Sequence, residues 1–433
     1  MRRLTIVSTI VLLLCGRSSG EAVSSANADD LTAVRGAATA FAVDAYSKAD
    51  KGDGNFFFSP FSISIGLGVV YGGAREKTET ELANAIQTDL DQARYQAAFA
   101  DLRGRINTSL KKSRVMLSVA KLVAHQQGYP VQESFISLAK DTYGCQTVPL
   151  DFKNASGDAV RQLNSWVSEK TKGKITSFVP QTAITPDTVL AILNAIYFKA
   201  TWASVFDEEL TKDRAFWPTA KKSKEVPTMY QKEKFAYGET PLVQVLELPY
   251  MGHGVSMLLV LPKEKAGLAA LERRLSTKSI VSWVRSLAPS DKYEVETYLP
   301  RFEMETDMDL TRVLRAMGAK RMFSPAKADL TGMSARKPLF ISTALHRAGV
   351  KVDEKGTEAW AATGFFAAMG AEWEPPPTKV FRADHPFLFF IMDKTNGVIL
   401  FMGRVMNPET PDRTTKKSTL SSEAAPSAAP SER

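Results

Sequence analysis

The sequence predicts an α+β fold, and three observations lead to it. Segments with strand patterns and segments with helix patterns are mixed along the chain without a regular β–α–β alternation. The apolar content of 44% is enough for a sizeable core, and no internal repeat is visible. The 433 residues suffice for one large domain or for two to three ordinary ones.

Helices are expected where apolar residues recur at helical spacing. Residues 31–49 show this spacing, and residues 62–70 are almost wholly apolar with small side chains, so the second helix should be central and closely packed. Shorter helices are expected over 163–167, 268–275 and 310–317.

A further helix is expected over residues 78–86. Thr78 is the expected N-cap, and Glu81 stands three residues later, as in a capping box.

Strands are expected where the pattern alternates or is apolar on both faces. Residues 188–198 are apolar on both faces, which favours a central strand, and residues 114–125 alternate polar and apolar. The other expected strands are 56–58, 235–237, 243–249, 255–262, 294–300 and 337–341.

Residues 354–384 form an unusually long segment without a helical apolar stripe, ahead of an apolar strand over 385–392. Loops of this length are uncommon inside compact domains and usually serve a function. In its first half every second residue is small (Thr357, Ala359, Ala361 and Thr363), whereas the interleaved Glu358 and Trp360 are charged or large. Such alternation is typical of a strand with one packed face, although Ala and Gly also permit a flexible low-complexity insert.

The two ends of the chain are expected to lie outside the folded domain. Residues 1–20 combine Arg2 and Arg3, a short apolar run and small residues, which predicts a signal peptide and hence a secreted, extracellular protein. Residues 410–433 are rich in Ser, Ala and Pro and predict a disordered tail. The folded domain should therefore span 28–409.

Secretion would bear on two features of the chain, the pairing of its cysteines and the glycosylation of two sequons. Cys15 would leave with the signal peptide, so Cys145 remains alone, and we expect a semi-buried thiol and no internal disulfide. Asn107 and Asn154 begin triplets that permit glycosylation.

Several stretches together resemble the serpin family over residues 31–409. The most specific are the run Asn194–Phe198 and the segment Glu354–Thr363. The others are Phe58–Ile63, Asn164–Val167, Leu248–Tyr250, Leu299–Phe302 and Phe401–Val405.

The resemblance implies one domain with three β-sheets, about nine helices and an exposed reactive-centre loop within 354–384. A serine protease would cleave this loop, and the first half of the loop would then insert into the central sheet while the acyl-enzyme persists. The implied inserting hinge comprises Glu354, Gly356, Thr357, Glu358, Ala359, Ala361, Ala362 and Thr363. No bulky, charged or proline residue occurs at the inward positions, which favours an inhibitor.

The resemblance also implies other site residues. Hydrogen bonds that control sheet opening, the shutter, would involve Ser59, Ser62, Asn194 and His346, and insertion would start at the breach beside Trp202. An ion pair is expected between Glu354 and Arg301. Glu76 and Ala200 stand where glycines are usual, at turns that call for positive φ.

Counting seventeen residues from Glu354 places the reactive bond between Gly370 and Ala371, with Met369 as the alternative. Residues 365–372 contain no Lys or Arg, so the expected targets are elastase-, subtilisin- or chymotrypsin-like proteases rather than trypsin-like ones. Arg382 lies too far along the chain to be the cleaved residue, although a long distal leg through Pro375–Pro377 keeps Glu372 and Trp373 open.

Other functions are less well supported. No metal, phosphate or nucleophile motif indicates an enzyme, and we expect no cofactor and no metal. A net charge of +8 spread among nearly as many acids does not indicate nucleic acid, and we expect no membrane partner and a monomer. A non-inhibitory carrier is the main alternative. A weaker one is a glycosaminoglycan site formed by Arg103, Arg105, Lys111, Lys112 and Arg114.

Overall fold

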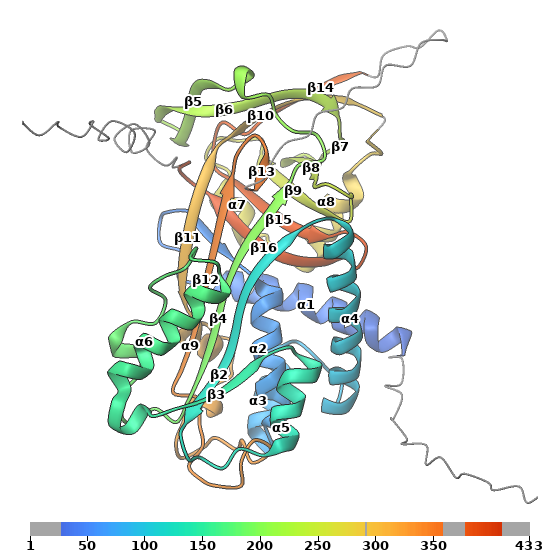
Figure 1. Cartoon of the computed structure of the whole chain (residues 1–433). Coiled ribbons are helices and arrows are strands. Elements are labelled where there is room, and N and C mark those ends of the chain that lie inside the picture. Colours follow the sequence, from blue (N-terminus) through green and yellow to red (C-terminus); the bar gives the residue numbers. More distant parts are fainter. Residues whose placement is uncertain (1–26, 291, 358–376, 409–433) are drawn as a thin grey trace, which may run out of the picture.

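The computed structural model describes residues 27–290, 292–357 and 377–408. This part of the chain contains three β-sheets and nine α-helices, as the resemblance implied (Figure 1). No helix among the described residues is long and apolar enough to cross a membrane. The expected signal peptide and tail lie outside the described residues.

The helices are α1 (Ala28–Lys48), α2 (Pro60–Gly73), α3 (Glu76–Ala85), α4 (Gln92–Lys112), α5 (Glu133–Ser137), α6 (Phe152–Lys170), α7 (Leu268–Arg273), α8 (Thr277–Ser286) and α9 (Leu310–Ala316). A π-helical turn, η1 (Leu138–Thr142), follows α5.

Five long or medium strands form the large sheet, in the order β11 (Phe302–Asp309), β12 (Thr343–Val352), β4 (Leu190–Thr201), β2 (Met116–Gln126) and β3 (Gln146–Leu150). A two-residue strand, β13 (Gly356–Thr357), pairs with the end of β4. β12 and β4 are parallel neighbours, whereas β2 is antiparallel to β4.

The second sheet, the core sheet, has the order β1 (Phe56–Phe58), β16 (Val398–Val405), β15 (Phe387–Asp393), β9 (Val255–Pro262), β8 (Val243–Pro249) and β7 (Ala236–Glu239). The third, the small sheet, consists of β14 (Thr378–Arg382), β10 (Glu294–Pro300), β6 (Lys222–Lys234) and β5 (Lys212–Thr219), and it lies at one end of the molecule (Figure 1).

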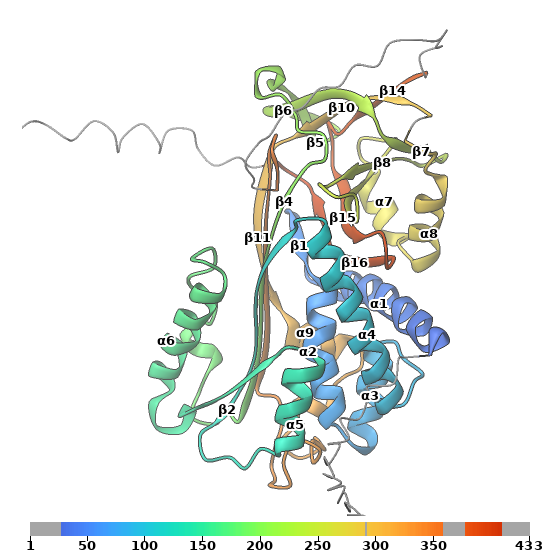
Figure 2. The ribbon, with the colours of Figure 1, turned by 45° about the vertical axis from the view of Figure 1, so that its right-hand side comes forward.

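The large sheet separates two packed layers. Figure 2 shows α6 on one side of it and α2, α4 and α5 on the other. The alternation of β4 follows this division, because Ile192 and Ile196 belong to the main core whereas Ala191 and Leu193 belong to the cluster under α6. Both faces of β4 are therefore buried, as its apolar pattern predicts.

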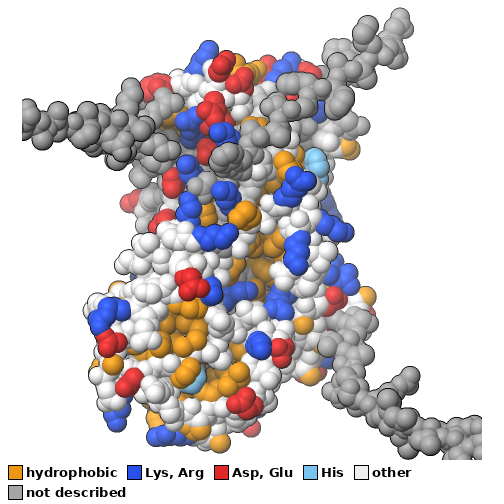
Figure 3. Space-filling model, viewed as in Figure 1, with side chains coloured by type: hydrophobic (Ala, Val, Ile, Leu, Met, Phe, Trp, Pro, Cys, Tyr) orange, Lys and Arg blue, Asp and Glu red, His pale blue; other side chains and the backbone are white. Residues whose placement is uncertain are grey.

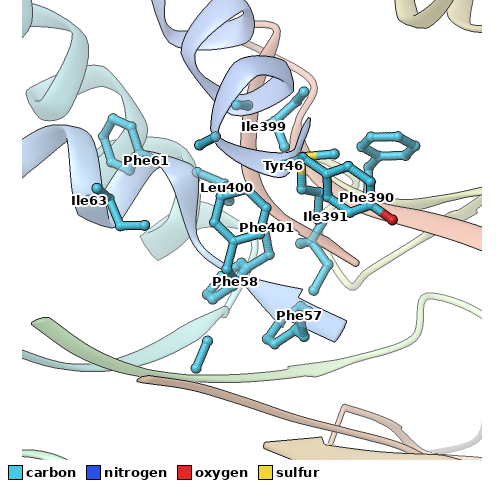
Figure 4. Packing of buried hydrophobic residues seen from close by; sticks show 14 of the residues in the cluster. Tyr46, Phe57, Phe58, Phe61, Ile63, Phe390, Ile391, Ile399, Leu400 and Phe401 are labelled. Carbon is cyan, nitrogen blue, oxygen red and sulfur yellow. The ribbon is translucent and has the colours of Figure 1, made fainter. Parts of the chain in front are cut away.

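The main core is dense in aromatic side chains where α2 meets the core sheet. Phe57 stacks on Phe401 with ring centroids 5.1 Å apart, and Tyr46 meets Phe56 edge to face at 5.8 Å. Figure 4 shows this cluster between the start of α2 and β15–β16. This packing places α2 behind the large sheet, and α2 in turn positions the site described below.

Two expectations about local structure are wrong. Thr78 is not an N-cap, because α3 already begins at Glu76; the Thr78 hydroxyl instead accepts the backbone N–H of Asp329. Likewise Glu81 accepts the N–H groups of Lys320 and Arg321 instead of closing a capping box.

Residues 337–341 form no strand, although Leu339 and Ile341 are buried. The backbone N–H of Ile341 bonds to Met322 rather than to a sheet neighbour. This segment leads into β12 beside β4, and β4 is already paired with β2 and β12. The apolar residues of the segment therefore reflect burial and not strand pairing.

The two positions where glycine is usual differ. Glu76 adopts φ 55°, the positive value that a glycine there would accommodate. Ala200 lies inside β4 and does not have positive φ, so the expectation of a turn at Ala200 is wrong.

Candidate functional site

The candidate site is the seam between the paired strands β4 and β12, from its middle to the end that lies toward the small sheet (Figure 1). That end is called the top of the seam. These strands pair from Thr343↔Ala191 to Gly349↔Tyr197. Beyond the turn that follows β12, the chain reverses and β13 pairs antiparallel with β4, Gly356 opposite Thr201 and Thr357 opposite Ala200. Because β4 and β12 are parallel, a strand between them that continues from the turn after β12 would be antiparallel to both, which is the direction that β13 already has.

Gly356 is required by this close pairing. Its φ is 136°, and a Cβ atom there would lie 2.3 Å from the carbonyl oxygen of Ala200. Any other residue would therefore disrupt the entry of the chain beside β4.

The turn before β13 is firmly anchored. Glu354 is only 3% exposed, and its carboxylate accepts hydrogen bonds from Arg301 Nε, at 2.6 Å, and from the Thr211 hydroxyl. The expected ion pair between Glu354 and Arg301 is present. The Glu354 carbonyl also accepts the N–H of Phe206 at 2.9 Å, so the loop emerges from a fixed point.

Trp202 closes the top of the seam. It is 1% exposed and stacks on Tyr250 with centroids 4.5 Å apart and planes 6° apart. Its indole N–H donates to the Asp353 carbonyl at 3.0 Å, and its backbone N–H donates to Lys355 at 3.1 Å. The expected breach tryptophan thus ties β4 to the turn that carries the loop.

Replacing Arg301 with alanine should lower the free energy of unfolding by about 3 kcal/mol, because the Glu354 carboxylate would remain buried without a cation. Urea denaturation measures the change. Lys355→Ala is the control: its partner Glu208 is 60% exposed, so this loss should stay below about 0.5 kcal/mol. Equal losses in the two variants would show that the buried pair has no special weight.

The four expected shutter residues lie together at the middle of the seam. Asn194 Nδ2 donates to the Ser62 carbonyl at 2.7 Å, which turns Asn194 Oδ1 toward the Ser62 hydroxyl, 2.9 Å away, and His346 Nδ1, 3.0 Å away. The Ser59 N–H donates to His346 Nε2 at 3.1 Å, and the Ser59 hydroxyl to Leu400 at 2.7 Å. The network thus joins α2, β4, β12 and β16.

These bonds determine the protonation of His346. Nε2 accepts from Ser59, so the proton of the neutral ring is on Nδ1, where it donates to Asn194. Burial lowers the pKa of His346 to about 3, because a charged ring would be desolvated there. His346 and Asn194 are also direct neighbours in the β4–β12 register, so their bond links the two strands.

The distal end of the loop is shorter than expected. Residues 378–382 form β14, paired in parallel with β10, so the segment without regular structure cannot reach 384. Arg382 is paired with Tyr298 in that strand, with its guanidinium 4.6 Å from the tyrosine ring. Residues 358–376, including Gly370, Ala371 and Met369 and the hinge beyond Thr357, lie outside the described residues.

The remaining expected residues are dispersed. Asn107 on α4 and Asn154 on α6 are exposed, although the Asn154 amide bonds to Asp151. Cys145 is fully buried rather than semi-buried, and burial raises its pKa to about 12. In the described part of the chain, no three His, Cys, Asp or Glu side chains are grouped to hold a metal.

The five bases of the glycosaminoglycan alternative do not form one patch. Arg103 and Lys111 line a cavity toward β2, whereas Arg105 and Lys112 line a cleft toward Gly252 and Gly254. Arg114 contacts the sulfur of Met251. Arg105 is also paired with Asp101 at 3.0 Å.

Two residues of the site were missed from the sequence. Thr211 supports Glu354 but belongs to no pattern that distinguishes it from ordinary loop residues. Tyr250 lies in the family-like stretch Leu248–Tyr250, but nothing in that stretch indicates its stacking on Trp202. Only their contacts across the fold identify them.

Comparison with known proteins agrees with the family resemblance found in the sequence. A family model described as "Serpin (serine protease inhibitor)" matches residues 36–408. Leukocyte elastase inhibitor of Bos taurus is 38% identical over 378 residues, which cover 86% of this chain and 98% of that protein, and the Homo sapiens protein of this name is 36% identical with the same coverage.

Solved structures show the same fold. Uncleaved ovalbumin has a TM-score of 0.77 at 29% identity and covers 87% of this chain and 100% of its own. Serpin48, described as a highly specific serpin of the insect Tenebrio molitor, has a TM-score of 0.77 at 30% identity, with 87% and 99% coverage. Human thyroxine-binding globulin in complex with its hormone has a TM-score of 0.77 at 28% identity, with 88% and 100% coverage.

Proposed function

This chain belongs to the serpin family of serine protease inhibitors, and we propose that it is a secreted suicide substrate that traps its protease by inserting the cleaved loop between β4 and β12. The observation that carries the proposal is the pairing of β13 with β4, because this pairing is the first step of such an insertion.

The register of β13 determines where each later residue would lie. Continued antiparallel pairing places Ala359 opposite Phe198 and Ala361 opposite Ile196, both in the main core. Directly opposed residues share a face of the sheet, so these loop positions must be small, as they are.

The other face of the inserted strand meets different surroundings. Ala362 would lie opposite Ala195 and Gly364 opposite Leu193, both under α6, where little space is left. Trp360 would lie opposite Tyr197, above that cluster, so its size does not obstruct insertion.

Insertion along all of β4 would reach residue 367, opposite Leu190, three residues before the proposed reactive bond at Gly370–Ala371 (alternative Met369). β4 is 12 residues long, so an acylated protease would be carried about 40 Å along the sheet.

The chemistry of trapping then follows from the loss of geometry in the protease. The protease serine attacks the carbonyl carbon of residue 370, forms an ester and releases the amine of residue 371. Pulling on the ester displaces it from the oxyanion hole and the histidine base that activate water, so deacylation stops.

The target class follows from the loop composition. Residues 365–372 are apolar or small except for Glu372, which favours elastase-, subtilisin- or chymotrypsin-like proteases over trypsin-like ones. Similarity to leukocyte elastase inhibitors supports this preference.

The test is incubation with elastase, subtilisin, chymotrypsin and trypsin, followed by electrophoresis in SDS. We expect SDS-stable complexes with at least one of the first three and none with trypsin, and a released peptide beginning at Ala371 by mass spectrometry. A cut after Arg382 would contradict the proposed specificity.

A non-inhibitory carrier is the second candidate, since thyroxine-binding globulin shares the fold. Loop insertion discriminates between the two: after cleavage within 358–376 an inhibitor should unfold at a much higher temperature than the native protein. An unchanged unfolding temperature and no stable complex would favour the carrier.

A further inference from the structure

A cavity of about 270 Å³ lies between α4, the start of α2 and β2, and it borders the seam described above, because Ser62 and Ile196 also line it. Its walls are mainly apolar: Phe61, Ile65, Leu110, Val115, Leu117, Val119 and Ile196. Figure 3 shows Lys and Arg side chains bordering exposed apolar surface in the region between α4 and β2.

One charged residue interrupts the apolar lining of β2. Val115, Leu117, Val119 and Lys121 follow one another at every second position and all line the cavity. The Lys121 ammonium group makes no hydrogen bond and no ion pair with any described residue, and the Cys145 thiol and the Arg103 guanidinium are close enough to act on it electrostatically.

Arg103 is the second incompletely satisfied cation. Its Nη2 donates to the Asp141 carbonyl at 2.9 Å, while its Nε is buried without a hydrogen-bond partner in the described part of the chain. The exposed Lys111 adds a third positive charge at the rim, and no carboxylate lines the cavity.

Cations that are partly buried without acidic partners are costly in an empty apolar cavity. An anion with an apolar body would pair with the cations and fill the rest. At about 30 Å³ for each water-sized group, the volume accommodates about nine of the twelve non-hydrogen atoms of a ten-carbon fatty acid, and the others would lie at the open rim.

We propose that this cavity binds a medium-chain monocarboxylate, with the carboxylate between Lys121 and Arg103 and the hydrocarbon chain against Val119, Leu110 and Ile65. The proposal does not depend on protease inhibition, because every residue that it uses belongs to the described fold and none belongs to the loop.

The test is calorimetric titration of the full-length protein with decanoate below its micelle concentration, at pH 7. We expect saturable binding of one decanoate, at least tenfold weaker binding of 1-decanol, and at least tenfold weaker binding of decanoate to Lys121→Met. Lys112→Met, which removes the same charge from the opposite side of α4, should bind decanoate within twofold of the wild type.

Lys121→Met should not harm the fold. Because it removes an unpaired, half-buried cation, the variant without ligand should unfold at a temperature no lower than the wild type. Decanoate should raise the unfolding temperature of the wild type but not of the variant.

The pH dependence provides a separate check. Burial lowers the pKa of Lys121 to about 8, with a further lowering by Arg103, whereas burial raises the pKa of Cys145 to about 12. Losing the Lys121 charge should weaken decanoate binding at least fivefold between pH 7 and 9.5.

Three outcomes would overturn the proposal. They are no binding to the wild type, equal binding to Lys121→Met, and equal binding of 1-decanol and decanoate.

Discussion

Replacing Thr357 with arginine should convert the inhibitor into a substrate: the protease still cleaves the loop, but the SDS-stable complex is lost. Position 357 pairs with Ala200, which is 3% exposed at the top of the main core. An arginine entering there would bury a charge without a partner, at a cost of several kcal/mol. If about 3 kcal/mol of that cost is felt at the barrier, insertion slows about a hundredfold, and deacylation occurs first.

Glu358→Arg is the matched control, one residue further along the loop. If the register of β13 continues in the inserted strand, the partner of residue 358 would be Lys199, which is half-buried and lies on the other face of the sheet from Ala200. Repulsion between such partly exposed charges costs less than about 1 kcal/mol, so complex formation should fall only a few-fold. Complex formation by Thr357→Arg at the wild-type level would show that the side chain of residue 357 is not buried when the loop inserts.

Most of the fold is visible in the sequence because most of its elements are buried in regular patterns. β8, β9 and β10 begin and end at the predicted residues, since their hydrophobic runs are bounded by polar or turn residues on both sides. Amphipathic helices were harder to predict. α4 went unpredicted because its exposed face carries so many polar residues that Tyr95, Phe99 and Leu102 do not stand out.

The errors share one physical cause. The N-cap expected at Thr78 and the strand expected at 337–341 are sensible local choices, but each depends on which partners are available across the fold. The Thr78 hydroxyl already accepts a hydrogen bond from the backbone N–H of Asp329, and the two edges of β4 are already paired with β2 and β12. Local patterns identify burial, whereas tertiary neighbours decide how a buried group is used.

The candidate site shows the same division between what local patterns identify and what tertiary contacts decide. Motif resemblance located Ser59, Asn194, His346 and Trp202, and the structure brings the first three into one hydrogen-bonded network. The register of β13 against β4 could not be read from the sequence, because it depends on the turn held by Glu354 and Arg301. That register is what turns an alternating loop pattern into specific residue pairs.

The native protein should lose stability in acid through His346. Its pKa is about 3 in the folded state and about 6.5 when unfolded. Its contribution to stability is therefore complete above about pH 6.5 and is lost as the pH falls toward 3, because only the unfolded state binds the proton in that range. The slope is about 1.4 kcal/mol per pH unit, or about 3 kcal/mol between pH 7 and pH 4.

Urea denaturation at a series of pH values isolates this residue when the wild type is compared with His346→Gln, which cannot titrate. The variant should be less stable at pH 7, since it loses a hydrogen bond to Ser59 or Asn194, but its stability should fall less steeply in acid. The exposed His253→Gln should keep the wild-type slope. Parallel slopes for the wild type and His346→Gln would contradict the assignment.

The same protonation acts on the seam itself. A proton on Nε2 removes the hydrogen bond from Ser59 and places a charge beside Asn194, at the point where β4 and β12 are linked. Any opening of the seam that admits water relieves that charge, so acid favours separation of the two strands. The uncleaved protein should therefore convert faster to an inactive, heat-stable form at pH 5 than at pH 7, and this acceleration should be absent in His346→Gln.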